Sequence, residues 1–113
     1  MMMNAIEKQW TRVCAVDDIA PDTGVCALYH GEQVALFRLS GQNDVFAISN
    51  HDPFGNANVL SRGIVGSRGD RLFVASPLYK QHFDLLTGEC FEDPLVRLKT
   101  WSVRVEEGQV LLA

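Results

Sequence analysis

The feature that most constrains this chain is the shortness of its apolar runs. They are rich in Val, Phe and Leu, they are separated by Gly, Asn and Asp, and none keeps a helical period over many turns. Turn pairs such as His30-Gly31, Thr87-Gly88 and Glu107-Gly108 stand between them. The pattern therefore predicts a mainly β domain. We expect its strands over residues 10–16, 25–29, 33–39, 45–49, 71–75, 82–85, 101–106 and 109–112.

The length and composition predict one folded domain. A chain of 113 residues is long enough to bury roughly two thirds of the surface that it exposes when unfolded. With 47% hydrophobic and 21% charged residues, the composition is that of an ordinary globular protein. No repeat or linker divides the chain. We expect a single domain over residues 1–113, in which residues 1–9 form a flexible N-terminal tail.

The charge argues against nucleic acid as a partner, because phosphate binding needs a surplus of Lys and Arg and this chain has a net charge of -4. No apolar run approaches the roughly 20 residues of a membrane helix, and the N-terminus lacks the basic-then-apolar layout of a signal peptide. We expect a cytoplasmic protein without a membrane partner.

The three cysteines, Cys14, Cys26 and Cys90, are far apart in the sequence and show no C-x-x-C spacing. Such spacing favours neither a zinc site nor a disulfide framework. We expect plain apolar packing for these side chains, since free Cys is among the most buried residue types.

Two segments do not fit a simple succession of strands. Residues 50–69, "NHDPFGNANVLSRGIVGSRG", contain no convincing strand. Compact domains rarely keep so long an irregular segment unless it binds something or is mobile. Residues 73–88, "FVASPLYKQHFDLLTG", run from a strand through a proline corner into a second strand and a glycine turn.

These segments resemble the paired cluster-binding loops of the Rieske iron–sulfur family. The resemblance is carried by "DPFGNANVLSRG" at 52–63 and "SPLYKQHFDLLTG" at 76–88, with the Leu-Ser-x-Gly ending, the Pro after the first ligand position, and the Phe-Asp and Thr-Gly pairs. It implies an all-β fold: a Rieske-like antiparallel β-sandwich whose two long loops form a vestigial cluster-binding subdomain.

The ligand positions of that family carry other residues here. The two cysteine positions fall on Asp52 and Ser76, and the two histidine positions fall on Phe54 and Tyr79. A Rieske cluster needs two thiolates and two imidazoles. We therefore expect these four residues not to be ligands and this chain to bind no [2Fe–2S] cluster. Aromatic rings at Phe54 and Tyr79 would instead fill the gap between the loops.

Other metal sites have few candidate ligands in these loops. His51, Asp52 and His82 are the donors nearby, and a transition metal normally needs three or four well-placed ligands. We expect no metal to be bound.

The segments "AISNHDPFGNANVLSRG" and "VASPLYKQHFDLLTGECFED", with the opening "VCAVDDI", are similar to one family in particular, the small subunit of the assimilatory NAD(P)H-dependent nitrite reductase. The resemblance implies a non-redox accessory subunit without catalytic residues or cofactors of its own. Its partner would be the large subunit, which carries FAD, an iron–sulfur cluster and siroheme and reduces nitrite to ammonium in nitrate assimilation.

Charged and polar residues at the loop tips are the candidate partner-binding residues, because exposed loops are favoured places for recognition. They are Arg62, Lys80, Gln81 and His82. Two alternatives remain open: a Rieske-type ferredoxin-like electron carrier with altered metal ligation, and a free-standing β-domain that binds an unrelated protein. Iron content separates the first alternative from an accessory subunit.

Overall fold

The computed structural model describes residues 9–40, 44–78 and 80–113 of this chain. The expected N-terminal tail therefore lies outside the described residues except for Gln9, and so does Tyr79. The strands are β1 Thr11–Ala15, β2 Thr23–Tyr29, β3 Glu32–Arg38, β4 Val45–Ser49, β5 His51–Asp52, β6 Ala57–Asn58, β7 Ile64–Arg68, β8 Arg71–Ala75, β9 His82–Asp84, β10 Val103–Glu106 and β11 Gln109–Leu112. Two short 3-10 helices are η1 Val16–Asp18 and η2 Leu60–Arg62.

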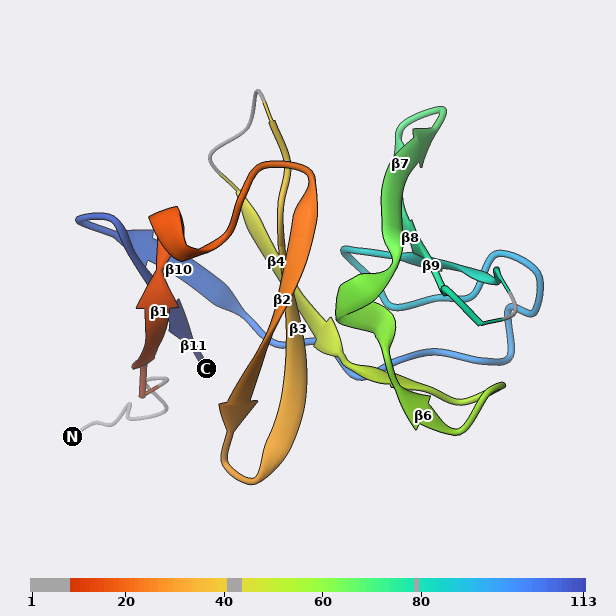
Figure 1. Cartoon of the computed structure of the whole chain (residues 1–113), viewed down its shortest axis with the longest axis horizontal. Helices are drawn as coiled ribbons and strands as arrows, with labels where there is room; N and C mark the ends of the chain where they lie inside the picture. The colour runs from red at the N-terminus through yellow and green to blue at the C-terminus, as the bar shows by residue number, and fades with distance from the viewer. Residues whose placement is uncertain (1–8, 41–43, 79) are drawn as a thin grey trace, which may run out of the picture.

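Every strand pair is antiparallel. The strands form the sheets β1-β11-β10, β2-β3-β4 and β7-β8-β9, with β5-β6 as a separate small hairpin. Figure 1 shows these three larger sheets side by side, with β2-β3-β4 in the middle and the small hairpin next to β7-β8-β9. The predicted all-β antiparallel class is confirmed.

The central strand of the middle sheet, β3, is buried on both faces. Side chains alternate along β3, so Ala35 and Phe37 pack into the core shared with β7-β8-β9, while Val34 and Leu36 pack into the core shared with β1-β11-β10. All four side chains are fully buried. Burial on both faces explains why residues 34–37 read as a continuous apolar run and not as an alternation.

The described domain begins and ends on the same sheet. Thr11 of β1 is paired with Leu112 of β11, and the sheet that contains them lies at the end of the molecule opposite the β5-β6 hairpin (Figure 1). The β5-β6 hairpin of the first segment therefore lies far from Thr11 and Leu112.

The strand prediction was right in most places and wrong in one. The limits of β4, β8 and β11 agree with the predicted ranges. The expectation that residues 50–69 lack a strand was wrong, because they contain β5, β6, η2 and β7. β7 is an edge strand that pairs along its whole length with β8, so backbone hydrogen bonds support it without an alternating apolar pattern.

Among the described residues, no helix is long and apolar enough to cross a membrane.

Candidate functional site

The first loop is organised by Asp52, whose side chain is fully buried at the end of β5. Its Oδ1 accepts hydrogen bonds from the backbone N–H of Phe54 at 2.8 Å and of Gly55 at 3.2 Å. An aspartate that caps its own turn in this way is common before proline, and Pro53 fixes the backbone φ angle at the corner. The carboxylate therefore has a structural function in the loop.

The second loop is closed by backbone hydrogen bonds around Ser76. The Ser76 N–H donates to the Gln81 carbonyl at 2.9 Å, and the Lys80 N–H donates to the Ser76 carbonyl at 3.1 Å. Lys80 itself lies in the left-handed region, with φ of 63°. The Ser76 side chain is 1% exposed and points back toward the first loop.

The two loops are joined by a hydrogen bond between side chains. The Ser76 hydroxyl donates to Oδ2 of Asp52, and both groups are buried. These residues occupy the positions at which the resemblance placed the two cysteines of a Rieske cluster. The loops are therefore held together by a direct bond at the level where a cluster would otherwise bridge them.

Apolar side chains cover this pair from the outside. The Phe54 ring lies 6.2 Å from that of the buried Phe83, centroid to centroid, and Phe54 is 37% exposed. Leu78, which is 45% exposed, lies so close to Gly55 that a Cβ atom there would collide with it. Phe54 thus forms part of the outer surface, and the expectation that it fills a buried gap holds only in part.

Asn50 is a further residue of the site that the sequence did not single out. It is 2% exposed, and its Oδ1 accepts from the backbone N–H of Ser61 at 2.7 Å while its Nδ2 donates to Gln33 at 3.0 Å. This side chain fastens η2 to the middle sheet. A polar residue directly after the apolar strand β4, at the start of the irregular segment, was the available signal.

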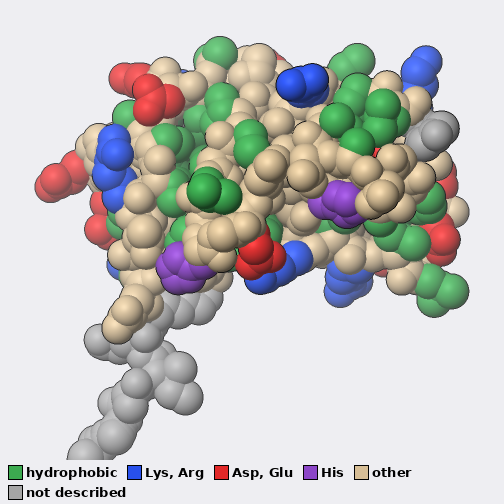
Figure 2. Space-filling model, turned by 60° about the horizontal axis from the view of Figure 1, so that its bottom comes forward, with side chains coloured by type: hydrophobic (Ala, Val, Ile, Leu, Met, Phe, Trp, Pro, Cys, Tyr) green, Lys and Arg blue, Asp and Glu red, His purple; other side chains and the backbone are tan. Residues whose placement is uncertain are grey.

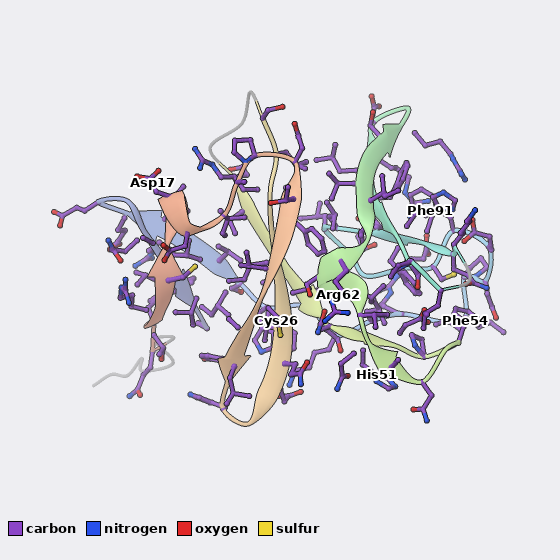
Figure 3. All side chains as sticks on the ribbon, in the orientation of Figure 1. Asp17, Cys26, His51, Phe54, Arg62 and Phe91 are labelled. Atoms are coloured by element: carbon purple, nitrogen blue, oxygen red, sulfur yellow. The ribbon has the colours of Figure 1, made fainter. Side chains whose placement is uncertain are left out.

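The structure separates the four candidate partner-binding residues into two kinds. Arg62 and Lys80 are exposed, and Figure 3 shows Arg62 on η2, on the same side of the molecule as the labelled His51. Gln81 and His82 are half-buried. His82 is tied to Glu92, whose carboxylate accepts from the His82 backbone N–H at 2.8 Å and lies 2.7 Å from its Nδ1. Their use in partner binding remains a prediction.

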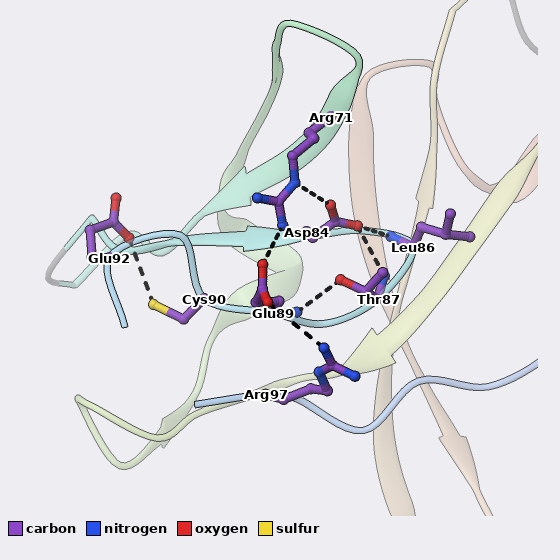
Figure 4. Close-up of polar contacts among 8 residues, drawn as sticks. All are labelled: Arg71, Asp84, Leu86, Thr87, Glu89, Cys90, Glu92 and Arg97. Atoms are coloured by element: carbon purple, nitrogen blue, oxygen red, sulfur yellow. Dashed lines mark hydrogen bonds and ion pairs between the residues drawn. The ribbon is translucent and has the colours of Figure 1, made fainter. Parts of the chain in front are cut away.

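Asp84 fastens the end of the second loop through hydrogen bonds to Leu86, Thr87 and Arg71 (Figure 4). Its Oδ1 accepts from the N–H groups of Leu86 at 2.8 Å and Thr87 at 2.9 Å, and its Oδ2 accepts from Nε of Arg71 at 2.9 Å. Although burial raises the pKa of Asp84, the hydrogen bonds from Thr87, Arg71 and Leu86 together hold it below its ordinary value. Asp84 therefore caps the turn that contains Leu86 and Thr87.

Arg71 links this carboxylate to the chain that follows β9. Its second nitrogen donates to Glu89 at 2.8 Å, and its guanidinium lies 4.1 Å from the centre of the Phe91 ring. The network in Figure 4 extends to Arg97, 3.7 Å from Glu89. The base of the second loop is therefore held by charged hydrogen bonds and by stacking on an aromatic face.

The donors of this chain do not fit a [2Fe–2S] cluster. Cys14 lies on β1, Cys26 on β2 and Cys90 beyond β9, and partial desolvation raises the pKa of all three thiols. Cys90 is buried, Cys14 is half-buried and Cys26 is exposed, so the expectation of apolar packing was wrong for Cys26. Within the ranges that the structure describes, no group of three or more His, Cys, Asp and Glu side chains could hold a metal ion.

The imidazoles that could serve as ligands already have other partners. Nδ1 of His51 lies 3.1 Å from the Asn58 side chain, and His82 is bound to Glu92. His51 and His82 are thus not brought together with Asp52 as a metal site.

Three comparisons with known proteins agree with this arrangement. The profile of the Rieske-like [2Fe-2S] domain family matches residues 9–113. The chain is 53% identical over 104 residues to the nitrite reductase (NADH) small subunit of Salmonella typhimurium strain LT2, covering 92% of this chain and 96% of that protein. The NMR structure of the Escherichia coli protein NirD is 51% identical with a TM-score of 0.85, covering 92% of this chain and 94% of that one.

A large subunit also contains a similar segment. The chain is 39% identical over 103 residues to the nitrite reductase [NAD(P)H] large subunit of Klebsiella oxytoca, and this match covers 91% of the present chain and 11% of that protein. The identity to separate small subunits is higher and spans nearly their whole length. The chain therefore belongs to the Rieske-like family of nitrite reductase small subunits.

Proposed function

We propose that this chain is the accessory small subunit of a cytoplasmic NAD(P)H-dependent nitrite reductase, which reduces nitrite to ammonium in nitrate assimilation. The observation that carries the proposal is the 53% identity to a nitrite reductase (NADH) small subunit over 96% of that protein. In this function the chain binds the large subunit and supports its activity, and it contributes no catalytic residue.

The partner is supported by the Klebsiella large subunit, of which the matching segment makes up 11%. A domain that is covalently part of one polypeptide stays at a high effective concentration beside the rest of it. The same domain on a separate chain needs a surface that binds the large subunit with enough affinity to form the same complex. We infer that this chain has such a surface for the large subunit.

The redox centres belong to the partner in this proposal. FAD, an iron–sulfur cluster and siroheme would all be held by the large subunit. The hydrogen bond between Ser76 and Asp52 supports a redox-silent small subunit, because it joins the two loops directly and engages the side chains at two of the four former ligand positions. In this proposal the two loops contribute their conformation and their outer surface to partner binding, and no redox centre.

The loop tips are the surface that we propose for docking. Pro53, Phe54, Pro77 and Leu78 are exposed there, and we call them the apolar tip. Figure 2 shows hydrophobic side chains gathered toward this end of the molecule, with Lys or Arg side chains on either side. Burial of apolar side chains within a rim of charges is the usual anatomy of an interface. Arg62 and Lys80 would meet acidic groups of the large subunit.

The proposal is tested by purifying the large subunit with and without this chain and measuring nitrite-dependent NADH and NADPH oxidation. We expect the two chains to co-purify and the activity to depend on both. Iron analysis of this chain alone accompanies the assay. Independent activity of the large subunit, with no association, would overturn the proposal. Stoichiometric iron in the isolated chain would favour the electron-carrier alternative.

The docking surface is tested separately with a charge reversal. Lys80→Glu should weaken association with the large subunit, because it places a like charge opposite an acidic surface. Arg12→Glu is the matched control, since Arg12 is also exposed but lies on β1, at the other end of the molecule. Equal effects of the two variants would remove Lys80 from the interface and leave the partner itself in place.

A further inference from the structure

His82 and Glu92 form a pair that is separate from the contact between the two loops. Nδ1 of His82 lies 2.7 Å from Oε2 of Glu92, and Oε1 of Glu92 accepts from the His82 backbone N–H at 2.8 Å. The His82 carbonyl accepts from the Phe91 N–H, also at 2.8 Å. His82 is therefore held to the chain beyond β9 by its ring, its N–H and its carbonyl. We call the two contacts with Glu92 the clasp.

The clasp lies where the second loop joins β9. His82 is the first residue of β9, and the carbonyl of the preceding Gln81 closes the loop by accepting from the Ser76 N–H at 2.9 Å. The Gln81 carbonyl and the His82 N–H belong to one planar peptide group. Rotation of this peptide group would break both hydrogen bonds, so Glu92 also holds the closure of the loop.

The imidazole of His82 is packed between two aromatic rings. The Phe73 ring meets it edge-on at 4.7 Å, and the Phe91 ring lies nearly parallel to it at 6.2 Å, centroid to centroid. The His82 side chain is 25% exposed. The ring is therefore held in place beside Glu92 and can still exchange protons with water.

Other charged groups lie on the strands and the chain next to the pair. They are Arg68, Arg71, Lys80, Asp84, Glu89 and Asp93. The guanidinium groups of Arg71 and Arg68 lie 4.1 and 5.1 Å from the centre of the Phe91 ring, and Arg71 is bonded to both Asp84 and Glu89. Asp93 accepts from the Leu95 N–H at 3.2 Å. Within the described ranges, Glu92 is the one carboxylate in contact with the imidazole.

Glu92 is negatively charged throughout the neutral range. Although burial raises the pKa of Glu92, the hydrogen bonds from the backbone N–H and the ring of His82 hold it below its ordinary value of 4.5. Its Oε1 also accepts from the Cys90 thiol at 3.7 Å (Figure 4). Burial raises the pKa of this thiol above its ordinary value of 9.0, so the thiol keeps its proton. The imidazole is therefore the member of the clasp that titrates near neutral pH.

We propose that His82 and Glu92 are a pH-sensitive clasp, which holds the second loop more firmly when the imidazole is protonated and loosens as the imidazole becomes neutral. An imidazolium ion attracts the carboxylate as an opposite charge. A neutral imidazole keeps the contact only as an uncharged donor, with its single proton on Nδ1.

The sign of the effect follows from which form of the ring the carboxylate favours. Because Glu92 favours the charged form, the stabilisation is fully present below about pH 6.5, where an ordinary imidazole is protonated, and it falls as the pH rises above this value. The clasp is a property of this chain alone and does not depend on the proposed partner.

Amide hydrogen exchange of the purified chain, followed by NMR, tests the clasp directly. After correction for the intrinsic rate at each pH, protection of the His82 amide should fall by about threefold to tenfold between about pH 5.5 and pH 8. Protection of the Ser76 amide should fall with it, because the Gln81–His82 peptide group is shared. Glu92→Gln keeps an acceptor and removes the charge, so it should reduce both changes to within about twofold.

Two histidine variants complete the experiment. His82→Gln removes the titrating ring and should also remove the change in Ser76 protection. His51→Gln is the matched control, since His51 is half-buried too but its Nδ1 lies 3.1 Å from the uncharged Asn58 side chain, and it should leave the wild-type change intact.

Thermal melting verifies that each variant keeps its fold. Equal protection of the His82 amide at both pH values in the wild type would overturn the clasp. So would a change of about threefold or more that persists in Glu92→Gln. If Glu92→Gln does not fold, His82→Gln decides, because a Ser76 amide that still loses protection in that variant responds to another group.

Discussion

The hydroxyl of Ser76 donates a hydrogen bond to Oδ2 of Asp52, and this buried pair joins the two loops. The two residues are 24 positions apart in the sequence. Oδ1 of the same carboxylate caps the first loop through Phe54 and Gly55. One aspartate therefore shapes its own loop and fastens the other. The arrangement explains how loops of cluster-binding shape keep their conformation with other residues at the ligand positions.

Removal of this bond should destabilise the domain. Ser76→Ala leaves Oδ2 of Asp52 buried without its donor, and we expect the free energy of unfolding to fall by about 1–3 kcal/mol. Urea denaturation measures the change. Ser67→Ala is the matched control, since Ser67 is exposed on β7, and it should lie within about 0.5 kcal/mol of the wild type. A Ser76→Ala variant as stable as this control would contradict a structural function for the pair.

Asp84 should make stability depend on pH in the acidic range. Its pKa in the folded protein lies below the ordinary value of 3.8. The carboxylate therefore stabilises the fold fully above that value, and the stabilisation is lost as the pH falls through the folded pKa. We expect Asp84→Asn to reduce the free energy of unfolding by about 1.5–3 kcal/mol at pH 7.

The same variant provides its own control across pH. Denaturation curves measured from pH 7 down to pH 3 should show a constant difference between wild type and Asp84→Asn in the upper part of the range. The difference should shrink below about pH 4, where the unfolded carboxyl is protonated. A difference that does not change over this range would show that the charge of Asp84 is not what stabilises the turn.

Most of the fold could be predicted from the sequence because its strands carry local signals. Residues 45–49 and 71–75 are short apolar runs bounded by turns, and both appear as strands with the predicted limits. β7 was missed because Gly66 and Ser67 interrupt any alternation and Ile64 at its start is 76% exposed. Its stability comes from pairing with β8 in a hairpin, and backbone pairing leaves no periodic pattern in the side chains of β7.

The site was predicted at the level of loops and not of individual contacts. The motif resemblance located Asp52 and Ser76, but the hydrogen bond between them depends on how the two loops approach each other. The function of Asn50 was missed for the same reason, since its partners Gln33 and Ser61 come from β3 and η2. Motifs of neighbouring residues do not predict contacts that form only when separate strands and loops pack together.

Gly88, the glycine at the end of the second loop, should tolerate replacement by alanine poorly. Its φ of +79° is unfavourable for other residues, and a Cβ atom there would collide with the backbone of Leu98. Gly69→Ala is the matched control, because Gly69 has φ of +60° with open space around it. We expect the positive φ angle to destabilise both variants by about 1–2 kcal/mol. The collision should add about 1–3 kcal/mol in Gly88→Ala alone.

Thermal or urea denaturation measures these two variants side by side. The decisive quantity is their difference, since the cost of the positive φ angle is common to both. Equal destabilisation would mean that the chain around Leu98 moves away at little cost. In that case the Thr87-Gly88 turn would not depend on close packing against the segment that leads to β10.

Phe54 offers a way to separate affinity from stability at the apolar tip. Because its ring is 37% exposed, Phe54→Ala should cost only about 1 kcal/mol of folding free energy, well below the 3–5 kcal/mol typical of a buried Phe. If the apolar tip docks on the large subunit, the same change should raise Kd by about tenfold or more, as truncation of a central aromatic side chain does at many interfaces.

Leu28→Ala is the control for this prediction, because it removes an exposed apolar side chain from β2, away from the tip. Binding of each variant to the immobilised large subunit, together with a melting curve, gives both quantities from the same preparations. Affinity that is lost only in Phe54→Ala places the apolar tip at the interface. A large loss of stability with unchanged affinity would instead make Phe54 a packing residue of the loops, since its contact with Phe83 would then account for its whole contribution.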